Sequence, residues 1–164
     1  MRIPIVNEQD EIIKNIDASE EQKGDISRVS ALWVINEKGE VLLAQRDFKN
    51  ARDPGRWGPA VAGTVEEGET YEENILKEAK EEIGLINIKI KIEEKNRRST
   101  SHEYFCQWFS VVVDSKYPFV KQDIEVEQIK WFAKNEILKL YKENPDSFIP
   151  TFETTIKYFL KNKE

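Results

Sequence analysis

One stretch of the sequence, GTVEEGETYEENILKEAKEEIGL at residues 63–85, defines a helix at both ends and places eight glutamates among its 23 residues. Thr70 is followed three residues later by Glu73, which is the spacing of a capping box. Gly84 can end a helix in a left-handed turn. We therefore predict a helix that begins near Tyr71 and ends at Gly84. The glycines near the two ends of the stretch, Gly63 and Gly84, are expected to shape the loop before the helix and the turn after it.

The apolar residues of this stretch fall on one arc of the predicted helix. At about 100° per residue, Ile75, Leu76, Ala79 and Ile83 share that arc, so we expect them to face the core. The helix is therefore predicted to pack against a sheet.

Three carboxylates, those of Glu78, Glu81 and Glu82, project from one flank of the same helix and border its apolar face. A run of charge is most often a solvated face. However, like charges at three- and four-residue spacings destabilise a helix, and Lys77 and Lys80 lie on a different arc. A bound cation explains this arrangement better. Because carboxylate oxygens are hard ligands, the expected ion is Mg²⁺, with Mn²⁺ as the alternative.

The remaining sequence predicts a mixed α+β domain, with a sheet, this central helix and helices at the C-terminus. Turn residues and the alternation of apolar and polar residues place the elements. Residues 1–27 are expected to form a hairpin extension ending in a short helical turn capped by a serine, and residues 28–164 the main domain. Within the main domain we predict a hairpin at 28–47, a loop at 51–59, strands at 60–63, 86–95, 103–114 and 126–132, and helices at 134–144 and 151–163.

Composition limits the classes of function. A net charge of −6 disfavours broad binding to large nucleic acids, which requires basic surface. The N-terminus has no apolar run long enough for a signal peptide or a membrane helix, so we expect a cytoplasmic protein without a membrane partner. The locally basic segment EEKNRRST, with Lys95, Arg97 and Arg98, is interpreted as a solvated turn, with a phosphate-contacting loop as the alternative.

The single cysteine and the single histidine are not expected to be chemical groups of the site. Cys106 excludes an internal disulfide, and its apolar surroundings in the sequence indicate packing. His102 has no cluster of partners in the sequence, which favours an exposed or strand-end residue over a base or a metal ligand.

From Gly63 onward the spacing resembles the Nudix box, Gx5Ex7REUxEExGU, in which U is an aliphatic residue. Every fixed position matches except the arginine, which is Lys77 here, while Ala79 is a small residue for its U position. A match of this length with fixed spacing is specific. The resemblance implies a Nudix fold, an α/β/α sandwich, and metal-assisted attack of water on phosphorus in a nucleoside diphosphate linked to another group.

The resemblance also implies roles for individual residues. Glu78, Glu81 and Glu82 would hold the metal together with a backbone carbonyl of Ala62 or Gly63. The implied catalytic group consists of Glu78, which would orient or deprotonate water, with Glu69, Lys77 and Glu125. Lysine lacks the two-pronged geometry of arginine, so Lys77 would orient Glu69 or Glu78 less tightly.

Candidates outside the box come from loops and strand ends. The resemblance implies one more acidic ligand or base from a loop before a strand, and Glu125, or else Glu127, is the candidate for it, with an exposed loop residue as the alternative. Arg46 could grip a phosphate or form a structural ion pair. Trp57 and Trp33 are the substrate-binding aromatics, which could stack on a base, although large aromatics more often belong to the core.

Three functions follow from these observations. The first is a Mg²⁺-dependent Nudix pyrophosphohydrolase acting on a nucleoside diphosphate derivative or nucleotide. The second is a catalytically weak nucleotide-binding module. The third is an enzyme similar to isopentenyl-diphosphate isomerase, whose expected cysteine and histidine are replaced here by Ala62 and Thr64. The substrate and the oligomeric state stay open, and the N-terminal hairpin could be a packing element, a lid or a homodimer contact.

Overall fold

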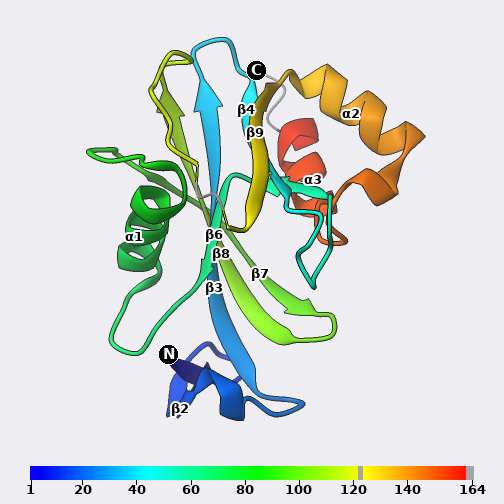
Figure 1. Cartoon of the computed structure of the whole chain (residues 1–164). Coiled ribbons are helices and arrows are strands. Elements are labelled where there is room, and N and C mark those ends of the chain that lie inside the picture. Colours follow the sequence, from blue (N-terminus) through cyan, green and yellow to red (C-terminus); the bar gives the residue numbers. More distant parts are fainter. Residues whose placement is uncertain (122–123, 162–164) are drawn as a thin grey trace. The chain divides into compact units, whose positions relative to one another are not determined.

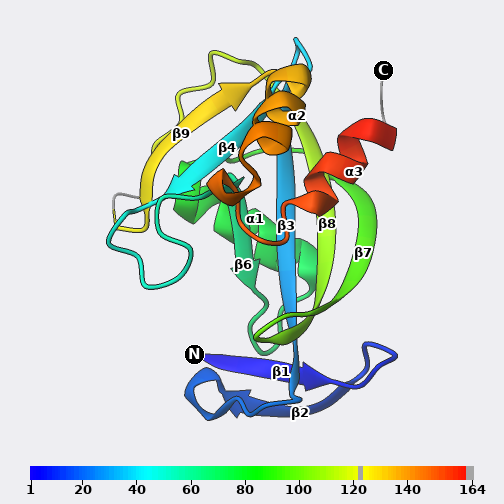
Figure 2. The same ribbon diagram turned by 90° about the vertical axis from the view of Figure 1, so that its right-hand side faces the viewer.

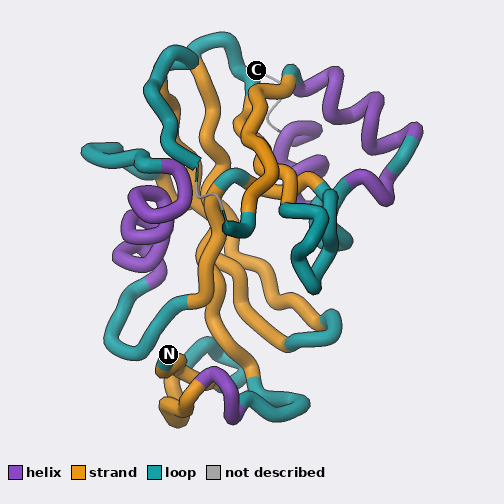
Figure 3. The backbone as a smooth tube through the Cα atoms, viewed as in Figure 1, coloured by secondary structure: helices purple, strands orange, loops and turns teal. Residues whose placement is uncertain are grey.

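The computed structural model describes residues 1–121 and 124–161. Strands make up more of the backbone than helices do (Figure 3). The strands are β1 (Arg2–Val6), β2 (Ile12–Asp17), β3 (Ile26–Asn36), β4 (Val41–Arg46), β5 (Trp57–Pro59), β6 (Val61–Thr64), β7 (Lys91–Ser99), β8 (Glu103–Val113) and β9 (Val126–Phe132). The helices are α1 (Tyr71–Ile83), α2 (Lys134–Glu143) and α3 (Glu153–Lys161), with short 3-10 turns η1 (Ala18–Glu20) and η2 (Pro145–Ser147) (Figure 1).

The chain divides into two compact units. The first contains Met1–Trp33 and Val61–Val111, and the second contains Val34–Ala60 and Val112–Glu164.

In the first unit, β3 is the strand on which the others assemble. It pairs with β1, with β6 and with β8, while β2 continues outward from β1 and β7 from β8. Figure 2 shows β1 and β2 side by side at one end of β3. Helix α1 packs against β6 (Figure 1). The glutamate-rich helix is thus held on the strand that immediately precedes it in the chain.

The core of the first unit is aromatic and β-branched. The indoles of Trp33 and Trp108 stack with centroids 4.1 Å apart and planes 13° from parallel. Ile75, Ala79 and Ile83 of α1 are fully buried, as predicted. Burying each large side chain contributes about 1.5–3 kcal/mol to folding. These contacts fix the helix on the sheet.

In the second unit, β4 lies between β5 and β9 in antiparallel pairing. The two C-terminal helices are present, and Phe148 stacks on Phe152 with centroids 4.4 Å apart. The predicted loop at residues 51–59 is wrong in its last third, because Trp57–Pro59 form β5. Short strands that pair with a neighbour are not visible in a segment rich in proline and glycine.

Three further predictions are corrected by the structure. The basic segment is not a turn: Lys95, Arg97 and Arg98 lie in β7, which starts at Lys91 rather than at residue 86. The 3-10 turn after β2 is capped by Asp17 instead of a serine, because the Asp17 carboxylate accepts a hydrogen bond from the backbone amide of Ser19.

The other elements agree with the sequence. The hairpin of β3 and β4, the strands β6, β8 and β9, and the helices α2 and α3 lie where they were predicted. The predicted end of the last helix, at residues 162–163, lies outside the described residues. The separation of residues 1–27 from residues 28–164 stays a prediction.

Candidate active site

Helix α1 has the limits predicted from its caps. The Thr70 hydroxyl accepts a hydrogen bond from the Glu73 amide at 3.1 Å, and the Glu73 carboxylate accepts one from the Thr70 amide at 2.8 Å. Gly84 ends the helix with φ of 65°, and its amide donates to the Lys80 carbonyl at 3.1 Å. The two ends are therefore determined by local interactions.

Leu76 does not belong to the buried arc, and 37% of its surface is exposed. It lies at the edge of that arc, and Asn74 is buried at the opposite edge. The prediction that Leu76 faces the core is therefore wrong. Three polar partners, described below, hold Asn74 inside, so the buried face of the helix extends toward Asn74 and away from Leu76.

Gly63 is required for a reason other than the predicted loop geometry. It lies within β6 and pairs with Ser30, and its φ is not in the left-handed region. A Cβ atom on Gly63 would lie 2.5 Å from Cγ and 2.6 Å from Oε1 of Glu78. The missing side chain therefore makes room for the Glu78 carboxylate against the strand. The prediction that Gly63 shapes a loop is wrong.

The Glu78 carboxylate lies in an environment that disfavours its charge. Burial raises the pKa of Glu78, the positive charge of Lys77 opposes this, and the negative charge of Glu81 raises the pKa further. Glu69 and Glu66 act in the same direction as Glu81. A cation bound near Glu78 would offset this unfavourable charge.

The other two glutamates of the flank differ in their contacts. Glu82 accepts a hydrogen bond from the Ala62 amide at 3.1 Å, which brings its carboxylate to the backbone of β6. Glu81 is exposed. Among the described residues, no group of three or more histidine, cysteine, aspartate or glutamate side chains is gathered closely enough to hold a metal ion.

The donor types nevertheless fit a hard divalent cation. Three carboxylates lie on one flank of α1, and Glu78 and Glu82 both reach the strand at Ala62 and Gly63. Carboxylate and carbonyl oxygens are the ligands that Mg²⁺ and Mn²⁺ prefer. The metal roles of Glu78, Glu81, Glu82 and Ala62 stay a prediction.

Lys77 holds the loop before the helix. Its Nζ lies 2.6 Å from Oε1 of Glu69 and 3.0 Å from Oε1 of Glu66. Burial alone would raise the pKa of Glu69, but hydrogen bonds from Lys77, the Glu66 amide and Asn74 outweigh it and lower that pKa. Burial would lower the pKa of Lys77, and its contacts with Glu69 and Glu66 instead raise it. Lys77 occupies the arginine position of the box, and it still contacts the carboxylate of Glu69.

Asn74 is a residue of this site that the sequence interpretation missed. It is fully buried and donates hydrogen bonds to the Thr64 carbonyl and to Oε2 of Glu69, both at 3.0 Å. The Ser30 hydroxyl donates to its amide oxygen. The sequence signal for its burial is the position of Asn74 directly before the apolar residues Ile75 and Leu76. Asn74 thus ties α1 to β3, to β6 and to the loop.

Four candidates lie in the second unit. Glu125 is exposed in the turn before β9, and its carbonyl accepts a hydrogen bond from the Asp47 amide at 3.0 Å. Glu127 is exposed in β9. Arg46 Nε donates to the Arg52 carbonyl at 2.8 Å, and Trp57 makes an edge contact with Phe132. Their catalytic and substrate-binding roles stay predictions.

Three other residues take structural positions. Trp33 is fully buried, so it is a core residue and the base-stacking role considered for it is not supported. Cys106 is buried, and burial raises the pKa of its thiol to about 12, which agrees with the predicted packing role. His102 is exposed between β7 and β8, as expected.

Comparison with known proteins supports the resemblance to the Nudix box. The model of the NUDIX domain family matches residues 25–152. An uncharacterized Nudix hydrolase of Pseudomonas aeruginosa, PA4841, is 28% identical over 85% of this chain and 83% of its own. An isopentenyl-diphosphate Delta-isomerase of Kocuria rhizophila is 27% identical over 71% of this chain and 68% of its own.

Solved structures share the fold at low sequence identity. DR0079 from Deinococcus radiodurans superposes with a TM-score of 0.75 and 21% identity, covering 88% of this chain and 90% of its own. The NUDIX domain of NrtR from Shewanella oneidensis, complexed with ADP ribose, gives 0.60 and 17%, covering 76% and 82%. These likenesses confirm the predicted fold. Within the described residues, no helix is both long and apolar enough to cross a membrane.

Proposed function

The chain belongs to the NUDIX domain family, and on that premise we propose that it is a hydrolase that cleaves a diphosphate linkage with the help of Mg²⁺ or Mn²⁺. Its substrate is a nucleoside diphosphate derivative or a nucleotide, and the reaction is attack of water on phosphorus. The protein acts in the cytoplasm on small molecules.

One observation carries this proposal: the Glu78 carboxylate is half-buried against Gly63, on the flank of α1 that also bears Glu81 and Glu82. A half-buried carboxylate whose charge is disfavoured by burial and by neighbouring carboxylates is typical of a site that binds a cation. A bound divalent cation would polarise phosphoryl oxygens and lower the pKa of water.

The side chains divide the remaining tasks. Glu78 orients the attacking water or accepts its proton, because its carboxylate lies on the flank of α1 where the cation would bind. Glu69 and Lys77 are positioning residues that hold the loop in front of the helix. Glu125 supplies an additional carboxylate, and Arg46 and Trp57 contact the substrate.

A nucleotide-derived substrate is supported by the complex of the Shewanella oneidensis domain with ADP ribose. Arg46 offers a guanidinium for phosphate and Trp57 a partly exposed aromatic ring. Specificity in such a fold depends on loops, so the substrate within this class is left to the assay.

A second candidate, isomerisation of isopentenyl diphosphate, is favoured by the Kocuria rhizophila relative. The positions where a cysteine and a histidine would be expected hold Ala62 and Thr64, which can neither donate the proton nor bind the metal. If the purified protein converts isopentenyl diphosphate, isomerisation becomes the proposed function in place of hydrolysis.

The test of the proposal is product release from a panel of phosphate compounds. The panel contains nucleoside diphosphate sugars, dinucleoside polyphosphates, CoA, NADH, ADP-ribose and nucleoside di- and triphosphates, each with and without Mg²⁺. Wild type is compared with Glu78→Gln and with the control Glu72→Gln, an exposed glutamate of the same helix. We expect metal-dependent release that Glu78→Gln lowers by about 100-fold or more and that Glu72→Gln leaves unchanged.

Two further variants test the second unit. Glu125→Gln should lower the rate and Glu127→Gln should not. Tight nucleotide binding without release from any compound would instead favour a binding module, and the hydrolase proposal would be withdrawn.

A further inference from the structure

The N-terminal hairpin, β1 and β2, is attached to the loop that leads into helix α1. Arg2 Nε lies 2.5 Å from Oε2 of Glu67, and the Glu67 amide donates to the Arg2 carbonyl at 2.9 Å. Glu67 lies between Glu66 and Glu69, the two partners of Lys77. One residue of the hairpin therefore holds the loop by both its side chain and its backbone.

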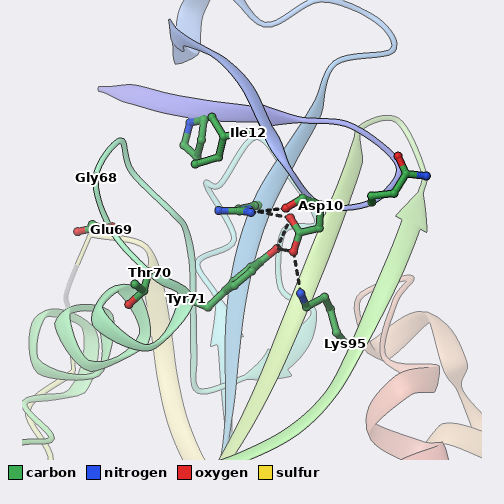
Figure 4. A pocket seen from close by; sticks show the side chains of 10 residues that line it. Asp10, Ile12, Gly68, Glu69, Thr70, Tyr71 and Lys95 are labelled. Atoms are coloured by element: carbon green, nitrogen blue, oxygen red, sulfur yellow. Dashed lines mark hydrogen bonds and ion pairs between the residues drawn. The ribbon is translucent and has the colours of Figure 1, made fainter.

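A second attachment is made by Asp10, in the turn between β1 and β2. Its carboxylate, only 9% exposed, lies 2.7 Å from Nε of Arg28 and 2.7 Å from Nζ of Lys95. The Tyr71 hydroxyl donates to both carboxylate oxygens, at 3.0 and 3.1 Å. Figure 4 shows the side chains of Tyr71 and Lys95 converging on Asp10. Tyr71 is the first residue of α1, so the hairpin turn holds the start of the helix.

The turn is shaped for this contact. Asp10 has a φ of 59°, in the left-handed region that aspartate tolerates better than most residues. Arg28 and Lys95 also lie over the ring of Tyr71, 5.2 and 5.1 Å from its centroid. The Tyr71 side chain is thus held at its hydroxyl by Asp10 and at its ring by two cations.

A cavity of about 530 Å³ lies beside these contacts. Pro4 and Ile12 of the hairpin line it together with Gly68, Thr70 and Tyr71 (Figure 4). The hairpin is therefore not packed against the loop over a continuous apolar surface. Polar contacts at Arg2 and Asp10 instead join the hairpin to the loop and to the start of α1. The Arg2–Glu67 pair is exposed, whereas Asp10 is a buried charge with several partners, which favours one geometry.

We propose that the N-terminal hairpin is a positioning element of the active site, in which Asp10 and Arg2 fix the loop of residues 65–70 and the first turn of α1. This proposal rests on the proposed hydrolase function. The loop carries Glu69, which Lys77 and Asn74 hold, and Lys77 directly precedes Glu78 in the helix. Movement of the loop is therefore transmitted to the residue that activates water.

Two variants and a control test this role. Asp10→Asn weakens the contacts with Arg28 and Lys95, and Tyr71→Phe removes only one hydroxyl and keeps the ring between the two cations. Glu8→Gln is the control, because Glu8 lies in the same turn but pairs with Arg97, away from the loop. Amide hydrogen exchange of residues 65–71 and titration with Mn²⁺ are measured together with kcat and KM.

We expect Tyr71→Phe to speed exchange in residues 65–71 by about tenfold, as for loss of a hydrogen bond to a charged group. In both variants kcat should fall while KM changes less than about twofold, because orientation is lost and not substrate binding. Asp10→Asn should have the larger effect. Glu8→Gln should leave exchange in the loop and kcat unchanged.

Faster exchange confined to residues 1–17, with kcat and Mn²⁺ affinity unchanged in Tyr71→Phe, would overturn the proposal and leave the hairpin a packing element. The exchange and Mn²⁺ measurements decide this even if wild type hydrolyses none of the panel compounds. Failure of the proposed function and failure of the positioning role are therefore separate results.

Discussion

Two groups of glutamates near helix α1 have opposite environments, although they are close in sequence. Glu66 and Glu69 contact Lys77, and hydrogen bonds lower the pKa of Glu69 below its ordinary value despite burial. Burial and neighbouring carboxylates instead raise the pKa of Glu78. We call these the paired group (Glu66, Glu69) and the flank group (Glu78, Glu81, Glu82).

Within one motif, the paired group has a structural role and the flank group is proposed to have a functional one. The paired group stabilises the folded loop, because its charge is neutralised inside the protein. In the flank group, burial and the neighbouring Glu81 disfavour the charge of Glu78, so we expect this charge to destabilise the metal-free fold and a bound cation to offset it. Substitutions should therefore change stability in opposite directions in the two groups.

The largest effect should come from Asn74→Ala, which breaks the paired group from inside. Removing the amide leaves the Ser30 hydroxyl, the Thr64 carbonyl and one Glu69 oxygen without that partner in a buried place. We expect a loss of about 2–4 kcal/mol in the free energy of unfolding, measured by urea denaturation. Glu72→Ala on the exposed side of α1 should cost less than about 0.5 kcal/mol. Equal losses in the two variants would contradict the role of Asn74.

Gly63→Ala should have the next effect, on the flank group. The added Cβ overlaps the Glu78 side chain, so the carboxylate must leave the strand, and we expect a loss of about 1–2 kcal/mol together with weaker Mn²⁺ binding. In a Glu78→Ala background the same change should cost less, because the overlapping atoms are gone. A cost that is the same in both backgrounds would show that Gly63 is needed for another reason.

The limits of α1 could be predicted because they depend on residues close in sequence. Thr70, Glu73 and Gly84 form caps within a few residues, and the structure has both of them. The Nudix spacing likewise predicted the fold, which the comparisons confirm. Local interactions leave a readable pattern in the sequence.

The features that the sequence did not reveal depend on contacts between distant residues. Gly63 is needed because Glu78 approaches it across the helix–strand contact. Asn74 can be buried because the Ser30 hydroxyl donates a hydrogen bond to its amide oxygen. The charges of Lys95 and Arg97 predict a solvated turn, but both residues lie in β7. Their partners, Asp10 and Glu8, lie more than 80 positions away.

Glu69→Gln tests the paired group through pH. The lowered pKa of Glu69 means that its contribution is fully present above the unfolded value of about 4.5 and is lost as the pH falls through the folded value. We expect Glu69→Gln to cost about 1 kcal/mol at pH 7, with the difference from wild type shrinking below pH 4.5. A difference that stays constant down to pH 3 would assign the effect to packing and not to the charge.

Glu78→Gln should have the smallest effect on stability and the opposite sign. In metal-free protein it removes a half-buried charge that Glu81, Glu69 and Glu66 repel, so we expect a gain of about 0.5 kcal/mol at pH 7, measured by urea denaturation with EDTA present. Saturating Mn²⁺ should reverse the order of the two proteins, since a ligand that binds the folded state stabilises it in proportion to its affinity, and wild type binds more tightly. A loss of stability in EDTA would place Glu78 in the paired group. The reversal, in contrast, would show that the charge of Glu78 is unfavourable for the fold alone and is kept for the ion it binds.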